Sequence, residues 1–241
     1  MRVDIWSDIA CPFCYVGMHQ LNKAVDKFAH KDKLSIVHHS YQLTPHWPKK
    51  TNKKLHELIA ESMGGSVSQA KAMNSNAASA ARAEGLQANM DDIVPVNTFD
   101  AHQLIHMAAE QGKEHEAIDR LFAAYFVNGE SVADTDTLVA IGEEVGLDKA
   151  TVRKSLQTNK YADDVREDIR QAKSLGIRGV PYFVIDDKYA MSGARGVSGF
   201  SSVLQKAWHE AHPIETIDDE LGGEAGVCAD GICLPSRDSY E

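Results

Sequence analysis

The sequence is poor in cysteine and has no long apolar run. Only four of its 241 residues are cysteine. No stretch approaches the roughly 20 apolar residues that a membrane-spanning helix needs. The first residues also lack the charged and apolar regions of a secretory leader. We therefore expect a cytoplasmic protein without membrane partners, and in that compartment cysteines are more often catalytic or metal-binding than structural.

Basic residues are outnumbered as well. The chain has 25 Lys and Arg against 35 Asp and Glu, which gives a formal net charge of −10. An acidic chain repels the phosphates of nucleic acid and anionic membranes, so neither is an expected partner. The hydrophobic content of 43% is ordinary for a globular protein. The length suits one large domain or a domain with a large insertion.

Strand signals are missing between residues 52 and 172, where helical spacing of apolar residues dominates. Before this block, the apolar run 3–7 and the β-branched and aromatic run 34–43 predict two strands. A helix-like run over 15–29 separates them. The sequence therefore begins with a strand, a helix and a strand, and continues as a helical block.

Strand character returns after the helical block. Residues 182–185 and 189–191 predict a hairpin around the turn Asp186-Asp187. A last helix is expected from Ser198 to Glu210. The complete order is strand, helix, strand, helical block, helix, hairpin and helix.

Cys11-Pro12-Phe13-Cys14 lies between the first expected strand and the first expected helix. A helix N-terminus offers free N–H donors and partial positive charge, which stabilise a thiolate at Cys11. Pro12 suits the first helical position, and Cys14, one turn further, could resolve a mixed disulfide. A CxxC at this place is typical of a thioredoxin-type redox site. Half of a zinc site and two incidental cysteines are the alternatives.

Gly179-Val180-Pro181-Tyr182-Phe183 places a proline directly before a strand. Opposite a CxxC, this proline indicates a cis peptide bond after Val180, and a trans proline at a strand start is the alternative. The Val180 backbone would then lie beside the reactive sulfur, where it could pair with an extended peptide. The expected catalytic residues are Cys11, Cys14 and Pro181. The expected substrate-binding residues are Pro12, Phe13, Val180 and Tyr182.

The order of elements and the position of the CxxC predict an α/β protein with a thioredoxin-like fold. A large all-helical insertion separates the second strand from the helix before the third strand. We expect the thioredoxin-like domain to be discontinuous, over residues 1–50 and 165–212, with the insertion over 51–164. Residues 213–241 are expected to form a mostly irregular tail.

Six segments of the sequence together point to a known family: Ser7-Asp8, Cys11–Gly17, Gln42–Pro45, Ala83–Leu86, Asn97–His102 and Gly179–Phe183. Through these segments the chain resembles the DsbA-like thioredoxin-fold family, and within it the FrnE-like cytoplasmic branch. The resemblance implies thiol–disulfide exchange on proteins or small thiols.

Two families of the same fold branch give the alternative of a glutathione-dependent isomerase or transferase. Kappa-class glutathione transferases and 2-hydroxychromene-2-carboxylate isomerases look similar along the helical block. They typically carry Ser near the position that Cys11 holds here, and this departure favours redox exchange.

Cys228 and Cys233 form a second pair in the expected tail, on either side of the turn dipeptide Asp230-Gly231. The first interpretation is a local disulfide or a second redox pair. The FrnE-like branch includes members with such a pair, which implies a possible electron relay to Cys11 and Cys14. Free surface thiols and half of a zinc site are the alternatives. No metal or cofactor is expected, and glutathione is a candidate co-substrate.

Several other side chains have a structural and a functional interpretation. Asp8 is expected to cap the loop before Cys11, with proton transfer from Cys14 as the alternative. His102 and His106 lie one helical turn apart, but no third metal ligand is evident, so both are expected to be structural.

The aromatic residues also divide between core and site. One cluster is expected to lie in the core rather than to form a substrate platform, and it consists of Leu121 with the aromatic residues Phe122, Tyr125 and Phe126. Trp6, Phe13 and Tyr182 are expected to form an apolar rim around Cys11.

We therefore expect a protein-disulfide oxidoreductase or isomerase that acts on protein or low-molecular-weight thiols and disulfides. Pro12-Phe13 places no charge between the cysteines, which predicts a weaker oxidant than the periplasmic enzymes. The direction of exchange stays open, as does the choice between monomer and homodimer. A non-enzymatic redox sensor or chaperone that binds partners through the helical block is a further alternative.

Overall fold

The computed structural model describes residues 1–213, 227–229 and 232–234, and the chain divides into two compact units, 1–208 and 209–241. In the larger unit, four strands form a mixed sheet in the order β2-β1-β3-β4. β1 pairs parallel with β2 and antiparallel with β3, and β3 continues into β4 as a hairpin. The strands are β1 (Arg2–Ser7), β2 (Ser35–Ser40), β3 (Tyr182–Ile185) and β4 (Tyr189–Ser192).

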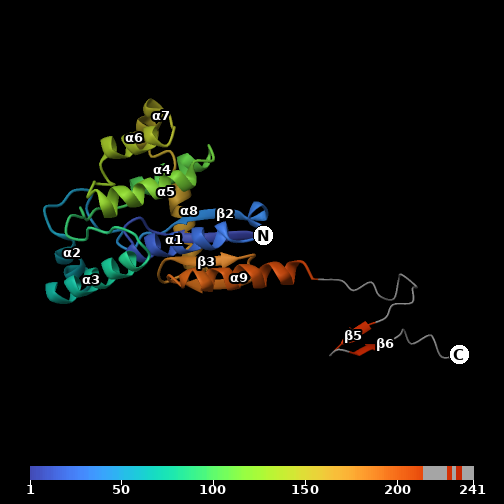
Figure 1. Ribbon diagram of the computed structural model, residues 1–241. Helices are drawn as coiled ribbons and strands as arrows, with labels where there is room; N and C mark the ends of the chain where they lie inside the picture. Colours follow the sequence, from blue (N-terminus) through green and yellow to red (C-terminus); the bar gives the residue numbers. More distant parts are fainter. Residues whose placement is uncertain (214–226, 230–231, 235–241) are drawn as a thin grey trace. The chain divides into compact units, whose positions relative to one another are not determined.

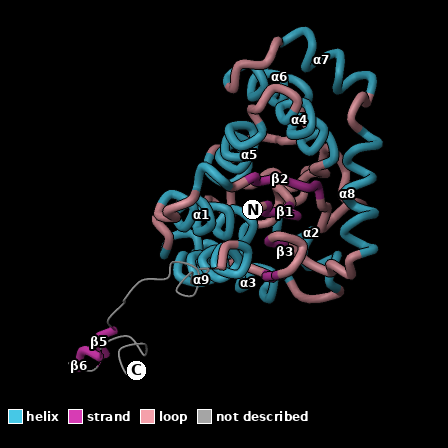
Figure 2. Tube along the Cα trace, turned by 90° about the vertical axis from the view of Figure 1, so that its right-hand side faces the viewer, coloured by secondary structure: helices cyan, strands magenta, loops and turns pink. Residues whose placement is uncertain are grey.

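Helices cover both faces of this sheet. α1 (Pro12–Asp26) and α9 (Gly196–Ala211) lie on one face, and α8 (Ala162–Ser174) lies on the other (Figure 2). The sides follow from strand alternation, since successive side chains of a strand point to opposite faces. Phe183 packs edge-on against Phe200 of α9, with ring centroids 4.8 Å apart.

The expected helical block fills the chain between β2 and α8. Figure 1 shows α2 and α3 as one pair and α6 and α7 as another, with α4 and α5 between the second pair and the sheet. α3 packs against α1, and α4 packs against α8. A short 3₁₀ helix, Lys31–Lys33, precedes β2, and a π-helical turn, Ala123–Val127, extends α5. The block consists of α2 (Leu55–Met63), α3 (Val67–Ala83), α4 (Phe99–Ala109), α5 (Glu114–Phe122), α6 (Thr135–Glu144) and α7 (Lys149–Thr158).

The predicted order of elements is confirmed, and the fold is thioredoxin-like with a helical insertion. The second strand is shorter than the sequence predicts, because it ends at Ser40 rather than at Leu43. The Leu43 amide donates instead to the Asp8 carboxylate, over 2.8 Å, and so leaves the sheet. The predicted hairpin turn is present, with positive φ angles of 50° and 52° at Asp186 and Asp187.

No helix among the described residues is long and apolar enough to cross a membrane. In the smaller unit, β5 (Val227–Ala229) and β6 (Ile232–Leu234) pair antiparallel, and the backbone register sets Cys228 opposite Cys233. The rest of the predicted tail from residue 214 onward lies outside the described residues. The disulfide or redox role of this pair therefore stays a prediction.

A buried ionic network joins the sheet to α8, and the sequence did not predict it. His39 on β2 lies between two carboxylates, with Nε2 at 2.7 Å from Asp4 and Nδ1 at 2.9 Å from Asp168 of α8. Asp168 also accepts from the Ser40 amide at 2.7 Å and lies 3.0 Å from His106 Nε2. His106 therefore has a structural role, as predicted.

The network shifts the pKa values of its members in opposite directions. Burial disfavours charged Asp168, but hydrogen bonds from His106, His39 and Ser40 outweigh it and hold the pKa of Asp168 well below its usual range. Burial also disfavours charged His39, yet its bonds to Asp168 and Asp4 raise the pKa of His39. At pH values above the ordinary pKa of aspartate, ionised Asp168 thus stabilises the fold. This contribution is lost as the pH falls toward the lowered pKa of Asp168 in the folded protein. His39 contributes fully below the ordinary pKa of histidine and loses its contribution as pH rises.

We predict that Asp168→Ala lowers the free energy of unfolding by about 3 kcal/mol near neutral pH, because it removes one of the two carboxylates that flank His39 and the carboxylate that lies beside His106. Urea unfolding measures this difference. The gap to wild type should narrow below about pH 4, where the unfolded state binds a proton at this position. Asp164→Ala, an exposed acid on the same helix, is the control and should change stability little. Equal losses in both variants would contradict the role of the network.

Candidate active site

Cys11 caps the N-terminus of α1. Its backbone is extended, and its Sγ accepts a hydrogen bond from the Cys14 amide at 3.3 Å. Its carbonyl accepts from the amides of Cys14 and Tyr15 at 3.0 and 3.2 Å. Pro12 occupies the start of the helix, and the first turn contains no acidic residue. A sulfur at this place therefore faces the positive end of the helix without a competing charge.

The segment before β3 lies against this sulfur. The peptide bond between Val180 and Pro181 is cis, as the sequence predicts. Cys11 Sγ lies 3.5 Å from the Val180 carbonyl oxygen, to which the thiol donates. The structure thus brings Cys11, Cys14, Val180 and Pro181 together from opposite ends of the chain.

Gly17 makes the close approach of α1 to Pro181 possible. A Cβ atom at Gly17 would lie 3.0 Å from Pro181 Cγ and 3.5 Å from Phe183 Cζ. The first distance is shorter than ordinary carbon–carbon contacts. A side chain one turn after Cys14 would therefore push against Pro181, and glycine at this position avoids that contact.

The two cysteines are free thiols of unequal accessibility. Cys11 is 3% exposed and Cys14 is fully buried. Burial raises the pKa of the Cys14 thiol well above its usual range, and the neighbouring Cys11 adds to the increase. Cys14 is therefore protonated at neutral pH in the reduced protein, which leaves Cys11 as the attacking sulfur.

Asp8 caps the loop before Cys11, as predicted. Its carboxylate is buried and accepts from the Ala10 amide at 3.3 Å, the Leu43 amide at 2.8 Å and the Thr98 hydroxyl at 2.8 Å. His102 Nε2 lies 3.4 Å from the same carboxylate. His102 is buried and structural, and the described residues contain no group of three or more His, Cys, Asp or Glu that could hold a metal.

A cavity of about 640 Å³ opens beside Cys11, between the start of α1 and the pair α2 and α3. Pro12, Phe13 and Val180 line it, which places three of the predicted substrate-binding residues around the sulfur. Tyr182 does not line it. Its side chain packs instead on the α8 face of the sheet, and its role in substrate binding stays a prediction.

The expectation that Trp6 forms part of the rim is wrong. Trp6 is 2% exposed, packs with Ala172 and Ile177, and stacks on His39 with ring centroids 4.4 Å apart. The reason is strand alternation, because Trp6 and Tyr182 are paired positions on the face that α8 covers. The predicted core aromatics are confirmed, since Phe122, Tyr125 and Phe126 are buried together with Leu121. Phe126 also reaches the cavity wall.

Sequence reasoning missed the cavity itself. Its far wall comes from α2 and α3. The available signal was Met63 and Met73, two large apolar side chains that are not among the buried residues of these helices. Such exposed apolar side chains gain significance only when the fold brings them to one place.

The sequence matches the DSBA-like thioredoxin domain family over residues 2–205. The chain belongs to this family. The family implies thiol–disulfide oxidoreductase or isomerase activity in general. Among curated proteins, the uncharacterized protein YwbO of Bacillus subtilis is 28% identical over 206 residues, which cover 85% of this chain and 96% of YwbO.

Solved structures extend the comparison. The probable DsbA oxidoreductase SCO1869 from Streptomyces coelicolor is 38% identical, covers 97% of this chain and 98% of its own, and has a TM-score of 0.82. Two others share the fold at low identity. A 2-hydroxychromene-2-carboxylate isomerase is 16% identical with a TM-score of 0.68, over 90% of this chain and all of that one. The structure of the cytosolic disulfide reductase DsbM from Pseudomonas aeruginosa with GSH is 15% identical and has a TM-score of 0.60. The match covers 87% of this chain and 100% of DsbM.

We predict that Gly17→Val lowers the free energy of unfolding by about 1–3 kcal/mol, because the added carbons force α1 and Pro181 apart. The same separation should slow disulfide exchange at Cys11. Thermal unfolding and a dithiol exchange assay measure the two effects. Gly179→Ala is the control for stability, since its Cβ would meet no atom within 4 Å. Unchanged stability in Gly17→Val would contradict the proposed close packing.

Proposed function

We propose that the protein is a thiol–disulfide oxidoreductase in which Cys11 is the nucleophile and Cys14 the resolving thiol. The observation that carries this proposal is the position of Cys11 Sγ, at the cap of α1 and 3.5 Å from the Val180 carbonyl. Cys11 lies at the positive end of the α1 dipole, and the half-buried segment at Val180 has a backbone with which an extended substrate can pair.

In the reducing direction, the Cys11 thiolate attacks one sulfur of a substrate disulfide. A bond forms between Cys11 and that sulfur, the substrate S–S bond breaks, and the other sulfur leaves as a thiolate. Cys14 then attacks Cys11, forms the Cys11–Cys14 disulfide and releases the second substrate thiol. Two electrons pass from the protein to the substrate, and the oxidising direction is the exact reverse.

Burial of Cys14 gives the second step a proton requirement. The thiol must lose its proton before it attacks, and its raised pKa makes the free thiol a poor nucleophile. The thiolate that leaves in the first step is the nearest new base and can accept this proton. Resolution would then follow only after a substrate disulfide has been opened.

The proposed substrates are protein or low-molecular-weight disulfides, with glutathione as a candidate co-substrate. The GSH-bound structure of DsbM supports a thiol partner of this type on the same fold. Assignment to the FrnE-like branch and a cytoplasmic location are part of the proposal. Cys228 and Cys233 are proposed to form a second redox pair, which their opposed backbone positions support, and to exchange electrons with the Cys11–Cys14 pair.

The fold it shares with 2-hydroxychromene-2-carboxylate isomerase favours a glutathione-dependent isomerase as the second candidate. The two candidates differ in their dependence on sulfur at position 11. Isomerase or transferase turnover that persists in Cys11→Ser, together with tight glutathione binding, would favour the second candidate over the first.

We predict that Cys11→Ser lowers insulin reduction and the refolding of a scrambled disulfide protein by several orders of magnitude, because the nucleophile is lost. Cys14→Ser should instead accumulate a mixed disulfide at Cys11, since nothing resolves it. Mass spectrometry of the intact protein detects the adduct. Activity that survives in Cys11→Ser, or the absence of any adduct in Cys14→Ser, would reject the mechanism.

We predict that the double variant Cys228→Ser with Cys233→Ser turns over insulin several-fold more slowly with glutathione as the reductant. The relay is lost, whereas the reduction potential of Cys11–Cys14, measured in glutathione buffers, should not change. Turnover equal to wild type would remove the relay from the proposal and leave the primary site unaffected.

A further inference from the structure

The cavity beside Cys11 has the size of a small-molecule site. Its volume of about 640 Å³ lies within the range of pockets that enclose a drug-sized ligand. Cys11 contributes to its wall, and α2 and α3 of the insertion form the opposite side. A compound bound here would therefore lie directly against the sulfur.

No Lys, Arg, Asp or Glu lines this cavity. Its polar groups also bond to each other in part, because Ser62 Oγ accepts from Trp47 Nε1 at 3.0 Å and lies 3.3 Å from His46 Nε2. The residues that line the cavity thus expose mainly carbon atoms to it. A carboxylate placed inside would lose water without gaining a counterion, which is unfavourable.

Exposed large apolar side chains are concentrated at this site. Among the described residues, six large hydrophobic side chains are exposed, and four of them line the cavity. These are Phe13 at 44%, Leu43 at 43%, Met63 at 62% and Met73 at 46%. None of these four side chains is buried in the core. Clusters of exposed apolar side chains of this kind mark binding sites. Methionine suits ligands of varied form because its side chain is flexible and polarizable.

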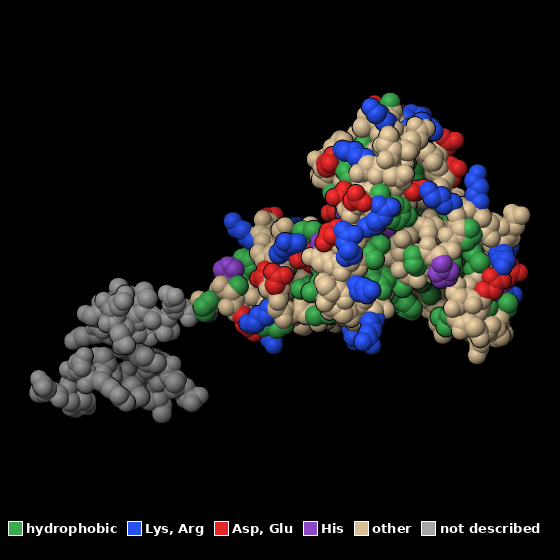
Figure 3. Space-filling view, turned by 180° about the vertical axis from the view of Figure 1, so that it is seen from behind, with side chains coloured by type: hydrophobic (Ala, Val, Ile, Leu, Met, Phe, Trp, Pro, Cys, Tyr) green, Lys and Arg blue, Asp and Glu red, His purple; other side chains and the backbone are tan. Residues whose placement is uncertain are grey.

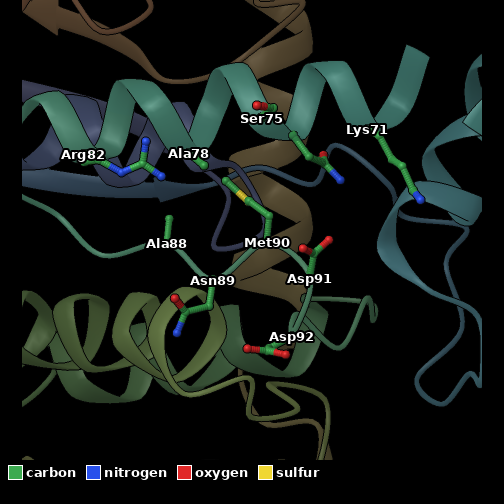
Figure 4. A pocket seen from close by; sticks show the side chains of 10 residues that line it. Lys71, Ser75, Ala78, Arg82, Ala88, Asn89, Met90, Asp91 and Asp92 are labelled. Atoms are coloured by element: carbon green, nitrogen blue, oxygen red, sulfur yellow. The ribbon is translucent and has the colours of Figure 1, made fainter. Parts of the chain in front are cut away.

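Asn74 and Met90 line both this cavity and a neighbouring trough, and charged side chains line that trough. Figure 4 shows the trough, where Lys71 and Arg82 extend from α3 toward the segment that carries Asp91 and Asp92. Figure 3 shows acidic and basic groups interspersed over the face of the described residues that it displays. The lack of charge around Cys11 is therefore a local property.

We propose that the low-molecular-weight substrate of Cys11 is an uncharged, apolar disulfide or thiol whose organic group fills this cavity, in preference to glutathione. The proposal rests on the thiol–disulfide exchange proposed above. When Cys11 attacks such a disulfide, one half of the substrate stays as a mixed disulfide with its organic group in the cavity. The other half leaves as a thiolate and takes up a proton. Cys14 then attacks Cys11 Sγ, so that the Cys11–Cys14 disulfide forms, the mixed disulfide breaks and the retained half leaves as a thiol, reduced by the two electrons of the cysteine pair.

The test compares three disulfides in single-turnover oxidation of the reduced protein. 4,4′-Dithiodipyridine is aromatic and uncharged near neutral pH, 2-hydroxyethyl disulfide is small and uncharged, and glutathione disulfide is charged. In the double variant Met63→Lys with Met73→Lys, the rate with dithiodipyridine should fall about tenfold. The rate with hydroxyethyl disulfide should stay near that of wild type, which controls for an altered reactivity of Cys11.

Matched variants separate the cavity from its surroundings. Val67→Lys adds the same charge at an exposed apolar residue of α3 that does not line the cavity, and all three rates should be unchanged. Met63→Ser with Met73→Ser removes apolar surface without adding charge and should also slow the reaction with dithiodipyridine. Lys71→Ala with Arg82→Ala should leave every rate unchanged.

Three results would overturn the proposal. The first is a dithiodipyridine rate that is insensitive to both methionine double variants. The second is a loss confined to glutathione disulfide in Lys71→Ala with Arg82→Ala, which would assign glutathione to the trough. The third is a loss confined to insulin reduction in the methionine variants, which would assign the cavity to a protein side chain. Failure of the underlying function is distinguishable, because Cys11→Ser would then react with all three disulfides as wild type does.

Discussion

The buried carboxylate of Asp8 holds together the parts of the chain that make the site. It lies where β1 ends, and it accepts hydrogen bonds from the loop that leads to Cys11, from the segment after β2 and from Thr98 at the start of α4. A buried carboxylate is stable only when its oxygens are satisfied in this way. The same group therefore fixes the loop before the nucleophile and joins the helical insertion to the sheet.

The sheet separates two kinds of interior. On the α1 and α9 face, packing is apolar, and it brings the N-terminus of α1 against Pro181 with Gly17 between them. On the α8 face, Asp4, His39 and Asp168 form a buried ionic network. The His39 network and the Cys14 thiol thus lie on opposite sides of one layer of strands. Cys14 lies in the apolar side, and this environment accounts for its raised pKa.

Local sequence signals predicted most of the fold and the centre of the site. The CxxC before a helical run, the proline before a strand and the Asp186-Asp187 turn each act through nearby backbone geometry, so one segment is sufficient to identify them. The ionic network and the cavity depend on which faces meet across long separations. His39 and Asp168 are 129 residues apart, and nothing local in either segment points to the other. Trp6 was misplaced for the same reason, since its proximity to Cys11 in sequence does not say which face of β1 it occupies.

The cavity wall and the reactive sulfur come from different parts of the chain. α2 and α3 of the insertion supply Met63 and Met73, whereas the start of α1 and the segment before β3 supply the chemistry. Under the proposal made above, substitutions at Met63 and Met73 alter which molecules reach the sulfur without changing the groups that activate it. Over evolutionary time, the insertion can diverge under selection for new substrates while the redox centre stays under purifying selection. Variation between relatives should accordingly concentrate on these two helices.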